Sequence, residues 1–222
     1  MKNVSLLIIL VGLLSCTAQK KTPKQVKEDK VQIAIAKVDY LFRSKPRKYV
    51  LEQAATLYVN NNNSLFVTAK GAETMVVVEG ELGPDGYMQD EIGDLIYKDF
   101  SANSLKIREK IWGKPFISQE NIPALAWEIN TETKKIGSFD CQLAKTNFRG
   151  RQYMAWFCKD IPFSDGPWKF SGLPGLILEI YDSKMDYQFI IKSIEMPTKE
   201  ETTFEFSNNG EELSFEIGRA HV

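Results

Sequence analysis

Histidine, the side chain that most often supplies a catalytic base or a metal ligand, occurs once in this sequence, at His221. His221 falls within the segment 217–222, "IGRAHV", which the codons ATC GGA AGA GCA CAC GTC would encode. That string matches a common sequencing-library adapter, so we expect residues 217–222 to be an artefact and Glu216 to be the last native residue. Without a histidine, the chain can build neither a Ser–His–Asp nor a Cys–His nucleophilic site.

Carboxylates are the remaining catalytic option. Asp160 and Asp165 flank the residues "IPFS", while Glu179 and Asp182 lie in or beside an apolar run that is typical of a strand. Strand alternation places residues 179 and 182 on opposite faces, so these two acids do not converge locally. We expect all four to be solvated surface acids and the protein not to be an enzyme. A carboxylate-dependent hydrolase is the alternative, and it requires paired acids in a cleft.

The three cysteines, Cys16, Cys141 and Cys158, are too few for a four-cysteine zinc site, and the sequence predicts no metal and no cofactor. A two-residue hairpin turn at Arg149–Gly150 would place Cys141 opposite Cys158 in a non-hydrogen-bonded pair. In such a pair the Cα atoms approach to about 4.5 Å, so we predict a disulfide between them. The alternative is two reduced thiols, and a longer turn would separate the pair.

The stretch "GPWKFSGLPGLILEIYD", residues 166–182, holds the motif Gly172, Pro174 and Gly175 in an apolar run. No lysine follows these glycines as in a phosphate-binding loop, so we expect a structural turn. The glycines permit a close backbone approach, and the proline biases Leu173 toward an extended conformation. The stretch is predicted to be a tight entry into a core strand at 176–182, covered by Trp168 and Phe170.

Basic and aromatic residues alternate in "FRGRQYMAW", residues 148–156. One interpretation is a nucleic-acid or glycan surface; the other is a tight turn with solvent-facing arginines and with Tyr153 and Trp156 on opposite faces. The chain carries a formal net charge of −1 and is 43% hydrophobic and 26% charged. Because this balance provides no clustered basic field, we favour the turn and expect no nucleic-acid partner.

Short alternating apolar segments separated by turn residues recur from residue 31 onward, for example "VQIAIAKVDYLF", "KYVLEQAATLYV" and "YQFIIKSIEM". Helical periodicity is weak, and only "SQENIPALAW" at 118–127 could form one short helix. This pattern predicts a mainly β fold, an antiparallel meander or open barrel, in a single domain over residues 31–216.

Residues 1–18 have the features of a signal peptide, with a basic start and the apolar run "VSLLIILVGLL". "LLSC" predicts a lipobox with lipidated Cys16 as the first mature residue, whereas "CTAQ" would permit ordinary cleavage before Gln19. Residues 19–30 are charged and read as a solvated tether. We therefore expect export to the periplasm or outer membrane, with membrane association through the lipid; a soluble periplasmic or secreted protein is the alternative.

The hexapeptide "GLPGLI" at 172–177, its lead "AWFCKDIPFSDGPWKF" and the segments "IWGKP" and "AWEINTETKKIGSFDCQLA" resemble the GLPGLI family of exported Bacteroidota proteins. The resemblance covers nearly all of residues 31–195. It implies a β-rich envelope protein without an assigned activity. Part of the pattern is similar to periplasmic lipoprotein carriers, which implies a curved half-open barrel around an apolar cavity.

From this resemblance and the density of aromatic residues we expect a non-enzymatic envelope protein that binds a lipid, another apolar ligand or a lipoprotein-like partner. The alternative is an interaction subunit of an outer-membrane import assembly, without a ligand cavity. A cavity of about 300 Å³ or more would favour the first. The residues expected to contact the ligand are Trp156, Trp168, Phe170, Leu173 and Pro174.

Overall fold

The computed structural model describes residues 32–45, 50–68, 75–79, 90–111, 113–198 and 202–213. The predicted signal peptide with Cys16, the tether at 19–30 and the suspected artefact at 217–222 lie outside these ranges. The described residues form strands and irregular segments, and they include no helix with the length and apolarity needed to cross a membrane.

The strands of the described ranges are joined mostly by short turns. Their bounds are β1 (Gln32–Ile33), β2 (Ala36–Ser44), β3 (Val50–Val59), β4 (Asn63–Thr68), β5 (Met75–Glu79), β6 (Asp94–Asp99), β7 (Ser104–Ile111), β8 (Lys114–Asn121), β9 (Glu128–Ile136), β10 (Phe139–Phe148), β11 (Arg151–Cys158), β12 (Leu176–Asp182), β13 (Tyr187–Glu195), β14 (Thr203–Phe204) and β15 (Glu211–Glu212).

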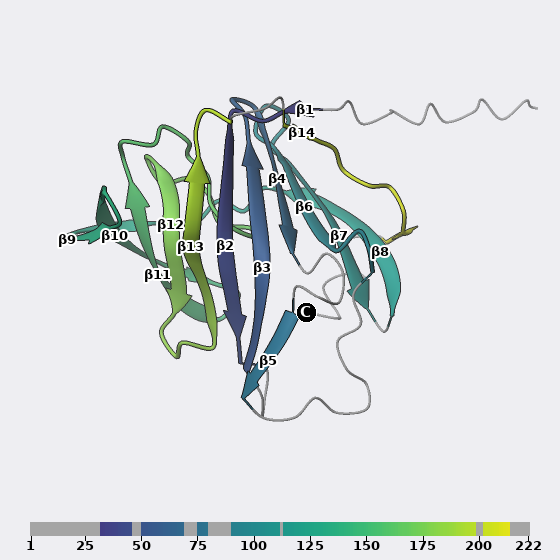
Figure 1. Ribbon diagram of the computed structural model, residues 1–222, viewed down its shortest axis with the longest axis horizontal. Helices are drawn as coiled ribbons and strands as arrows, with labels where there is room; N and C mark the ends of the chain where they lie inside the picture. The colour runs from purple at the N-terminus through teal and green to yellow at the C-terminus, as the bar shows by residue number, and fades with distance from the viewer. Residues whose placement is uncertain are drawn as a thin grey trace, which may run out of the picture.

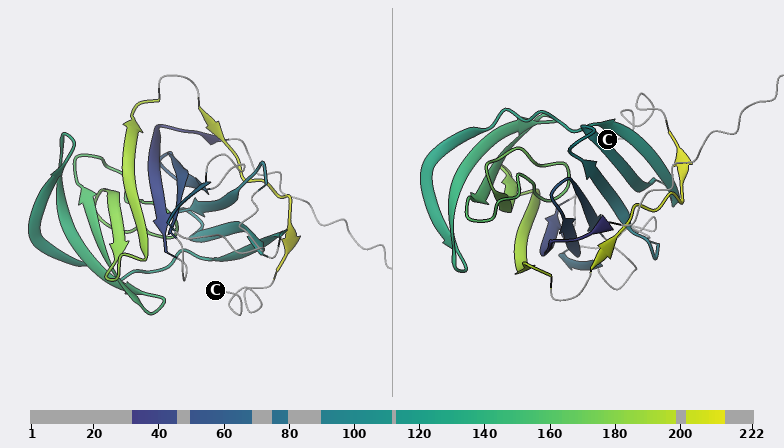
Figure 2. Two further views of the ribbon diagram at one scale, coloured as in Figure 1. Left: turned by 60° about the horizontal axis from the view of Figure 1, so that its bottom comes forward. Right: turned by 90° about the horizontal axis from the view of Figure 1, so that it is seen from above.

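Thirteen of these strands form one sheet in the order β15-β8-β7-β6-β4-β3-β2-β13-β12-β11-β10-β9, with β5 also paired to β3 (Figure 1). Neighbouring strands are antiparallel except for β15 and β8, which run parallel. The sheet curves strongly, and its two ends do not pair with each other, so it stays open and does not close into a barrel (Figure 2). The predicted mainly β, antiparallel fold is confirmed.

The concave face of the sheet holds the main core. In β2 the alternate residues Ala36, Val38 and Tyr40 are at most 1% exposed, as expected where one face of a strand is buried. Leu57 of β3 and Phe66 of β4 continue this buried layer. The curvature therefore encloses one hydrophobic cluster between the two halves of the sheet.

A second, smaller cluster covers the outer face of β4, β6 and β8. Phe204 and Phe206, from the C-terminal segment 202–213, pack there with Leu65, Leu95 and Ile117. The outward residues of these strands are therefore apolar too, and the same strands present their other residues to the concave face.

The short helix predicted at 118–127 does not form. Residues 118–121 end β8, where Gln119 is paired with Lys106 of β7, and residues 122–127 are irregular. Pro123 has no N–H to donate to a helical turn and disfavours the α conformation of Ile122. Pairing with β7 and this proline together explain why the prediction was wrong.

The hairpin of β10 and β11 has the register that the sequence predicts. Arg149 and Gly150 both have positive φ, 47° and 77°, so the turn has two residues and Cys141 is paired with Cys158. Both cysteines are described as free and buried thiols. Burial, together with the nearby Cys158, raises the pKa of Cys141 to about 12. The pairing is confirmed, and the covalent bond stays a prediction that thiol counting on denatured, unreduced protein tests.

Candidate functional site

The segment between β11 and β12, residues 159–175, folds back into the concave side of the sheet. At its end Gly175 has φ +148°, and a Cβ there would lie 2.1 Å from the carbonyl oxygen of Cys158. Gly172 has φ +93°, but a Cβ there would meet only the Trp127 ring at ordinary distances. Gly175 is therefore required for a close backbone approach and Gly172 for its conformation, so the motif is a tight entry into β12.

A buried lysine attaches this segment to the opposite half of the sheet. Lys98 of β6 donates from Nζ to Asp165 Oδ1 at 2.5 Å and to the carbonyl oxygens of Gly166 at 2.7 Å and Phe170 at 3.1 Å. The side chains of Lys98 and Asp165 are 0% and 1% exposed. Burial lowers the pKa of Lys98, and Asp165 opposes that shift. All three ammonium donors are used, which closes this end of the concave face.

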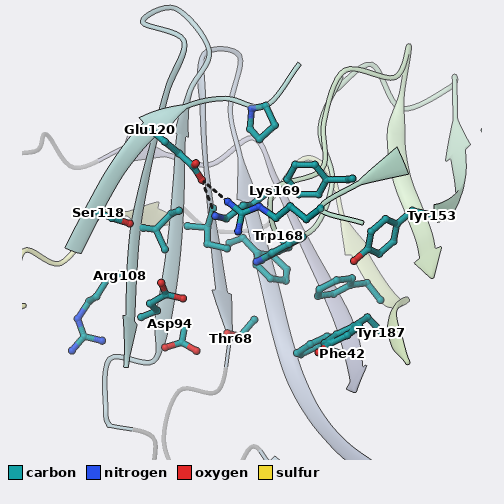
Figure 3. A pocket seen from close by; sticks show the side chains of 18 of the residues that line it. Phe42, Thr68, Asp94, Arg108, Ser118, Glu120, Tyr153, Trp168, Lys169 and Tyr187 are labelled. Atoms are coloured by element: carbon teal, nitrogen blue, oxygen red, sulfur yellow. Dashed lines mark hydrogen bonds and ion pairs between the residues drawn. The ribbon is translucent and has the colours of Figure 1, made fainter. Parts of the chain in front are cut away.

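Beside the closed end, the concave face is hollow. A cavity of about 980 Å³ lies between the strands β6–β8 and the strands β2, β11 and β13. Figure 3 shows Thr68, Asp94 and Ser118 toward one side and Phe42, Tyr153 and Tyr187 toward the other, with Trp168 between them. The two halves of the open sheet thus provide walls of different chemistry.

One wall is aromatic. Phe42 and Phe189 stack with ring centroids 4.5 Å apart and planes within 11°. Phe148 and Trp168 meet edge-on at 5.7 Å, and Tyr187 lies under the Arg151 guanidinium at 4.7 Å. Burial, followed by the charge of Asp182, raises the pKa of Tyr153, a further residue of this wall, to about 12. Together these rings offer a broad apolar surface with a few polar edges.

The other wall is mixed: apolar residues, Phe66, Ile96 and Ile107, alternate with polar ones. Thr68, Asp94, Ser118 and Glu120 line it from β4, β6 and β8. On the floor beside Phe42, Gln53 is 6% exposed, and its Oε1 has no hydrogen-bond partner among the described residues. A buried carbonyl oxygen without a donor is costly, so Gln53 lowers the stability of the sheet beneath the cavity.

The cavity lining includes four cationic residues, but Arg108 is in register with Leu95 and Ile117 and directs its side chain to the outer face of the sheet (Figure 3). Arg108 donates to Asp90 and to the carbonyl oxygens of Gly93 and Asn209. Arg151 donates to both Asp182, at 2.5 Å, and Asp186, at 2.9 Å.

The other two cations share one acid. Lys169 Nζ lies 2.7 Å, and Arg149 Nη2 3.4 Å, from the same oxygen of Glu120 (Figure 3). Burial lowers the pKa of Lys169, and the hydrogen bond to Glu120 opposes that shift. This corner of the cavity therefore holds two cations for one carboxylate.

Of the residues expected to contact a ligand, only Trp168 lines this cavity. Trp156 is on the opposite face of β11 from Tyr153, where its ring lies 4.7 Å from Lys134 Nζ and its indole donates to Tyr181. Phe170 and Leu173 are buried in the core at 0% and 1% exposure. Pro174 is exposed and lines neither this cavity nor the second one.

The second cavity, of about 620 Å³, lies beside the Lys98–Asp165 pair, on the other side of the segment 159–175 from the larger cavity. Its lining includes Asn60, Phe100, Leu125 and Asp165. Asp165 Oδ1 accepts from Lys98 and from the Gly166 amide, while Oδ2 is buried without a partner among the described residues.

Two of the four acids that were predicted to be solvated are buried instead. Asp165 and Asp182 are each 1% exposed, because Lys98 and Arg151 compensate their charges, so that prediction was wrong for both. Asp160 is exposed as predicted. The described residues contain no group of three His, Cys, Asp or Glu side chains that could hold a metal ion.

Glu179 pairs with Lys134 on the face of β12 opposite to Asp182, as strand alternation predicts. The turn at Arg149–Gly150 is confirmed, with Tyr153 and Trp156 on opposite faces. Its arginines do not simply face solvent, however, because both line the cavity. The sequence signal for this is that Arg151 and Tyr153 are two residues apart on one strand and so share a face.

A family model described as a protein of unknown function (Porph_ging), a family associated with Bacteroidota, matches residues 147–179. The match contains the "GLPGLI" hexapeptide and the cavity residues Phe148, Arg149, Arg151, Tyr153, Trp168 and Lys169. No curated protein matches the chain.

Solved structures of PNGF-II, in the P21 and C2 space groups, are similar to this chain with a TM-score of 0.53 in each case. The sequence identities are 12% and 11%, over 84% and 86% of this chain. The chain spans about a third of PNGF-II, since the matches cover 32% of that protein. At this identity the likeness shows a shared fold and nothing further.

Proposed function

We propose that this protein is a non-enzymatic binding protein of the cell envelope that holds an amphiphilic small molecule in the concave cavity. The observation that supports it is the cavity of about 980 Å³, in which an aromatic wall faces a wall of mixed polar and apolar residues. Ligand sites of small molecules have this size and composition, mainly apolar with a few placed polar groups. The mixed lining refines the purely apolar ligand expected from the sequence.

The location of the ligand within the cavity follows from the two walls. An apolar body would lie against Phe42, Tyr187 and Trp168, since stacking on aromatic faces buries its surface. The cavity supports this proposal over an interaction subunit of an import assembly, because that alternative requires a filled concave face.

The envelope location rests on the N-terminal sequence, with its apolar run and "LLSC" before the charged tether. A lipid on Cys16 would hold the binding domain at a membrane surface, where amphiphiles are available. Mass spectrometry of the mature N-terminus tests this part: an unmodified start at Gln19 would mean a soluble periplasmic or secreted protein.

Ligand binding is tested by filling the cavity from one strand. Ser118 lines the cavity from β8, and the next residue, Gln119, points to the exposed outer face. We expect the neutral fluorescent probe N-phenyl-1-naphthylamine to bind the native protein, and Ser118→Trp to weaken its binding at least tenfold. The matched variant Gln119→Trp should bind as the native protein does.

Two results would overturn the proposal. One is an absence of probe binding together with no amphiphile in organic extracts of protein purified without denaturant. The other is a Ser118→Trp variant that binds the probe as tightly as Gln119→Trp. A carboxylate hydrolase would instead show turnover that is lost in Asp94→Asn or Glu109→Gln, two further acids of the cavity.

A further inference from the structure

The corner formed by Arg149, Lys169 and Glu120 brings two cations onto one carboxylate, and Glu109 of β7 is a further acid near Lys169 that is not hydrogen-bonded to it. Both cations meet one oxygen of Glu120, at 3.4 Å and 2.7 Å. The side chains of Lys169 and Glu120 are 8% and 12% exposed, and that of Arg149 is 31% exposed. One carboxylate therefore faces two cations in a setting where water screens them poorly.

The other cations of the cavity do not share this arrangement. Arg151 is compensated by two carboxylates, Asp182 and Asp186. Arg108 has Asp90 and two carbonyl oxygens as acceptors. Among the cavity-lining cations, only Lys169 and Arg149 thus share a single hydrogen-bonded carboxylate.

Both residues also keep hydrogen-bond donors that no described acceptor uses. Lysine has three N–H donors and arginine five, and the contacts within the described residues use one of Lys169 and one of Arg149, both on Glu120. An aromatic ring lies beside each cation: Lys169 Nζ lies 5.6 Å from the Trp168 centroid and Arg149 Cζ 5.4 Å from that of Phe148. The corner adjoins the aromatic wall directly.

We propose that Arg149 and Lys169 form an anion subsite that binds the carboxylate or phosphate head of the amphiphile whose body lies on the aromatic wall. This inference rests on the proposed function and adds the chemical class of the ligand. Two cations with free donors provide the charge-assisted hydrogen bonds that such a head accepts. The ligand anion would compensate the positive charge of Arg149 and Lys169 that Glu120 alone does not neutralise.

The test compares three ligands with one chain and different heads: dodecanoate, dodecyl phosphate and dodecanol, titrated calorimetrically below their micelle concentrations. We expect the native protein to bind at least one of the two anions about tenfold or more tightly than the alcohol, which corresponds to about 1.4 kcal/mol. The ratio of the dissociation constants of dodecanoate and dodecyl phosphate identifies the head group that the subsite prefers.

Three variants separate the subsite from a purely structural ion cluster. Lys169→Gln should remove most of the preference for the anion while leaving dodecanol binding unchanged. Glu120→Gln should act in the opposite direction, with at least threefold tighter anion binding and a larger ligand-induced rise in Tm, because it removes the competing carboxylate. Lys184→Gln, at the exposed β12–β13 turn, is the control and should change nothing.

The possible failures are distinguishable. If all three ligands bind equally, or if Lys169→Gln weakens them to the same extent, the cluster only connects the walls and the anion subsite is wrong while ligand binding stands. If none of the three binds, the proposed function fails and the subsite fails with it.

Discussion

The two ends of the concave face both contain a lysine paired with an acid, and they differ in how completely the hydrogen-bond donors of the lysine are used. At the closed end, Lys98 uses all three donors, on Asp165 and two carbonyl oxygens, at 0% exposure. At the open end, Lys169 has one described acceptor, Glu120, which it shares with Arg149. The first lysine is held within the core; the second faces a cavity.

This difference teaches how the same pair of residue types can serve structure in one place and binding in another. A buried charge whose partners are all provided by the protein has nothing to offer a ligand, and removing any partner is costly. A buried cation that the protein neutralises only in part is stabilised most by binding an anion from solution. The two ends therefore differ mainly in how many hydrogen-bond donors of the lysine have acceptors within the protein, and less in how deeply the lysine is buried.

The largest effect is expected at the closed end. Lys98→Met leaves the carboxylate of Asp165 buried without its cation and two carbonyl oxygens without a donor. Breaking a buried pair in this way lowers the free energy of unfolding by about 3–5 kcal/mol. Urea denaturation at pH 7 measures it.

Lys192→Met, at an exposed position of β13, is the control and should unfold as the native protein does. The double variant Lys98→Met with Asp165→Asn should recover part of the loss, because it no longer buries an unpaired charge. A Lys98→Met variant within 1 kcal/mol of the control would contradict a structural role for this pair.

A smaller effect is expected from the two glycines of the motif. In Gly175→Ala the added Cβ would lie 2.1 Å from the Cys158 oxygen and 3.0 Å from the Lys159 Cα, both backbone atoms that cannot yield without moving a strand. We expect Gly175→Ala to destabilise by about 3 kcal/mol. Gly172→Ala has only ordinary contacts and a positive φ, so about 1–2 kcal/mol is expected.

Thermal and urea unfolding of the two variants compare these positions directly, and probe binding shows whether the cavity is affected. Both variants should keep the native affinity for N-phenyl-1-naphthylamine, since neither glycine lines the larger cavity. Equal stabilities for the two variants would show that conformation alone, and not the close approach at Gly175, explains the motif.

Much of the fold follows from local sequence patterns. Alternation in segments such as β2, the two-residue turn at Arg149–Gly150 and the pairing of Cys141 with Cys158 could all be predicted, because each depends on residues close in the chain. The tight entry at Gly175 is also a local property. The helix prediction failed where strand pairing outweighed a weak local preference.

The candidate site could not be predicted in the same way. Its walls come from strands far apart in the chain, such as β2 with Phe42 and β8 with Glu120, and only the curvature of the sheet brings them together. Lys98 meets Asp165 across the same curve. The density of aromatic residues near 148–178 did point to Trp168, but it did not distinguish residues that fill the core from residues that line a cavity.

The smallest expected effect is a pH dependence of stability at the open end, which a bound anion should change. Burial holds the pKa of Lys169 below its usual value of 10.5, against the opposing effect of Glu120. Below the folded pKa both states carry the proton, and the buried charge lowers stability. Between the folded pKa and 10.5 the unfolded chain binds more protons than the folded one, so the contribution of Lys169 to the free energy of unfolding rises with pH.

Lys169→Met lacks this titration. The difference in unfolding free energy, native minus Lys169→Met, should therefore grow from pH 8 to pH 10.5 in urea titrations, whereas the difference from Lys192→Met should stay flat. Dodecanoate at saturation should reduce the growth, because a bound anion favours the protonated lysine and moves its folded pKa back toward 10.5. A difference that falls with pH would show that the folded pKa of Lys169 lies above 10.5, so that the surrounding carboxylates more than offset the cost of burying its charge and no room is left for a ligand anion.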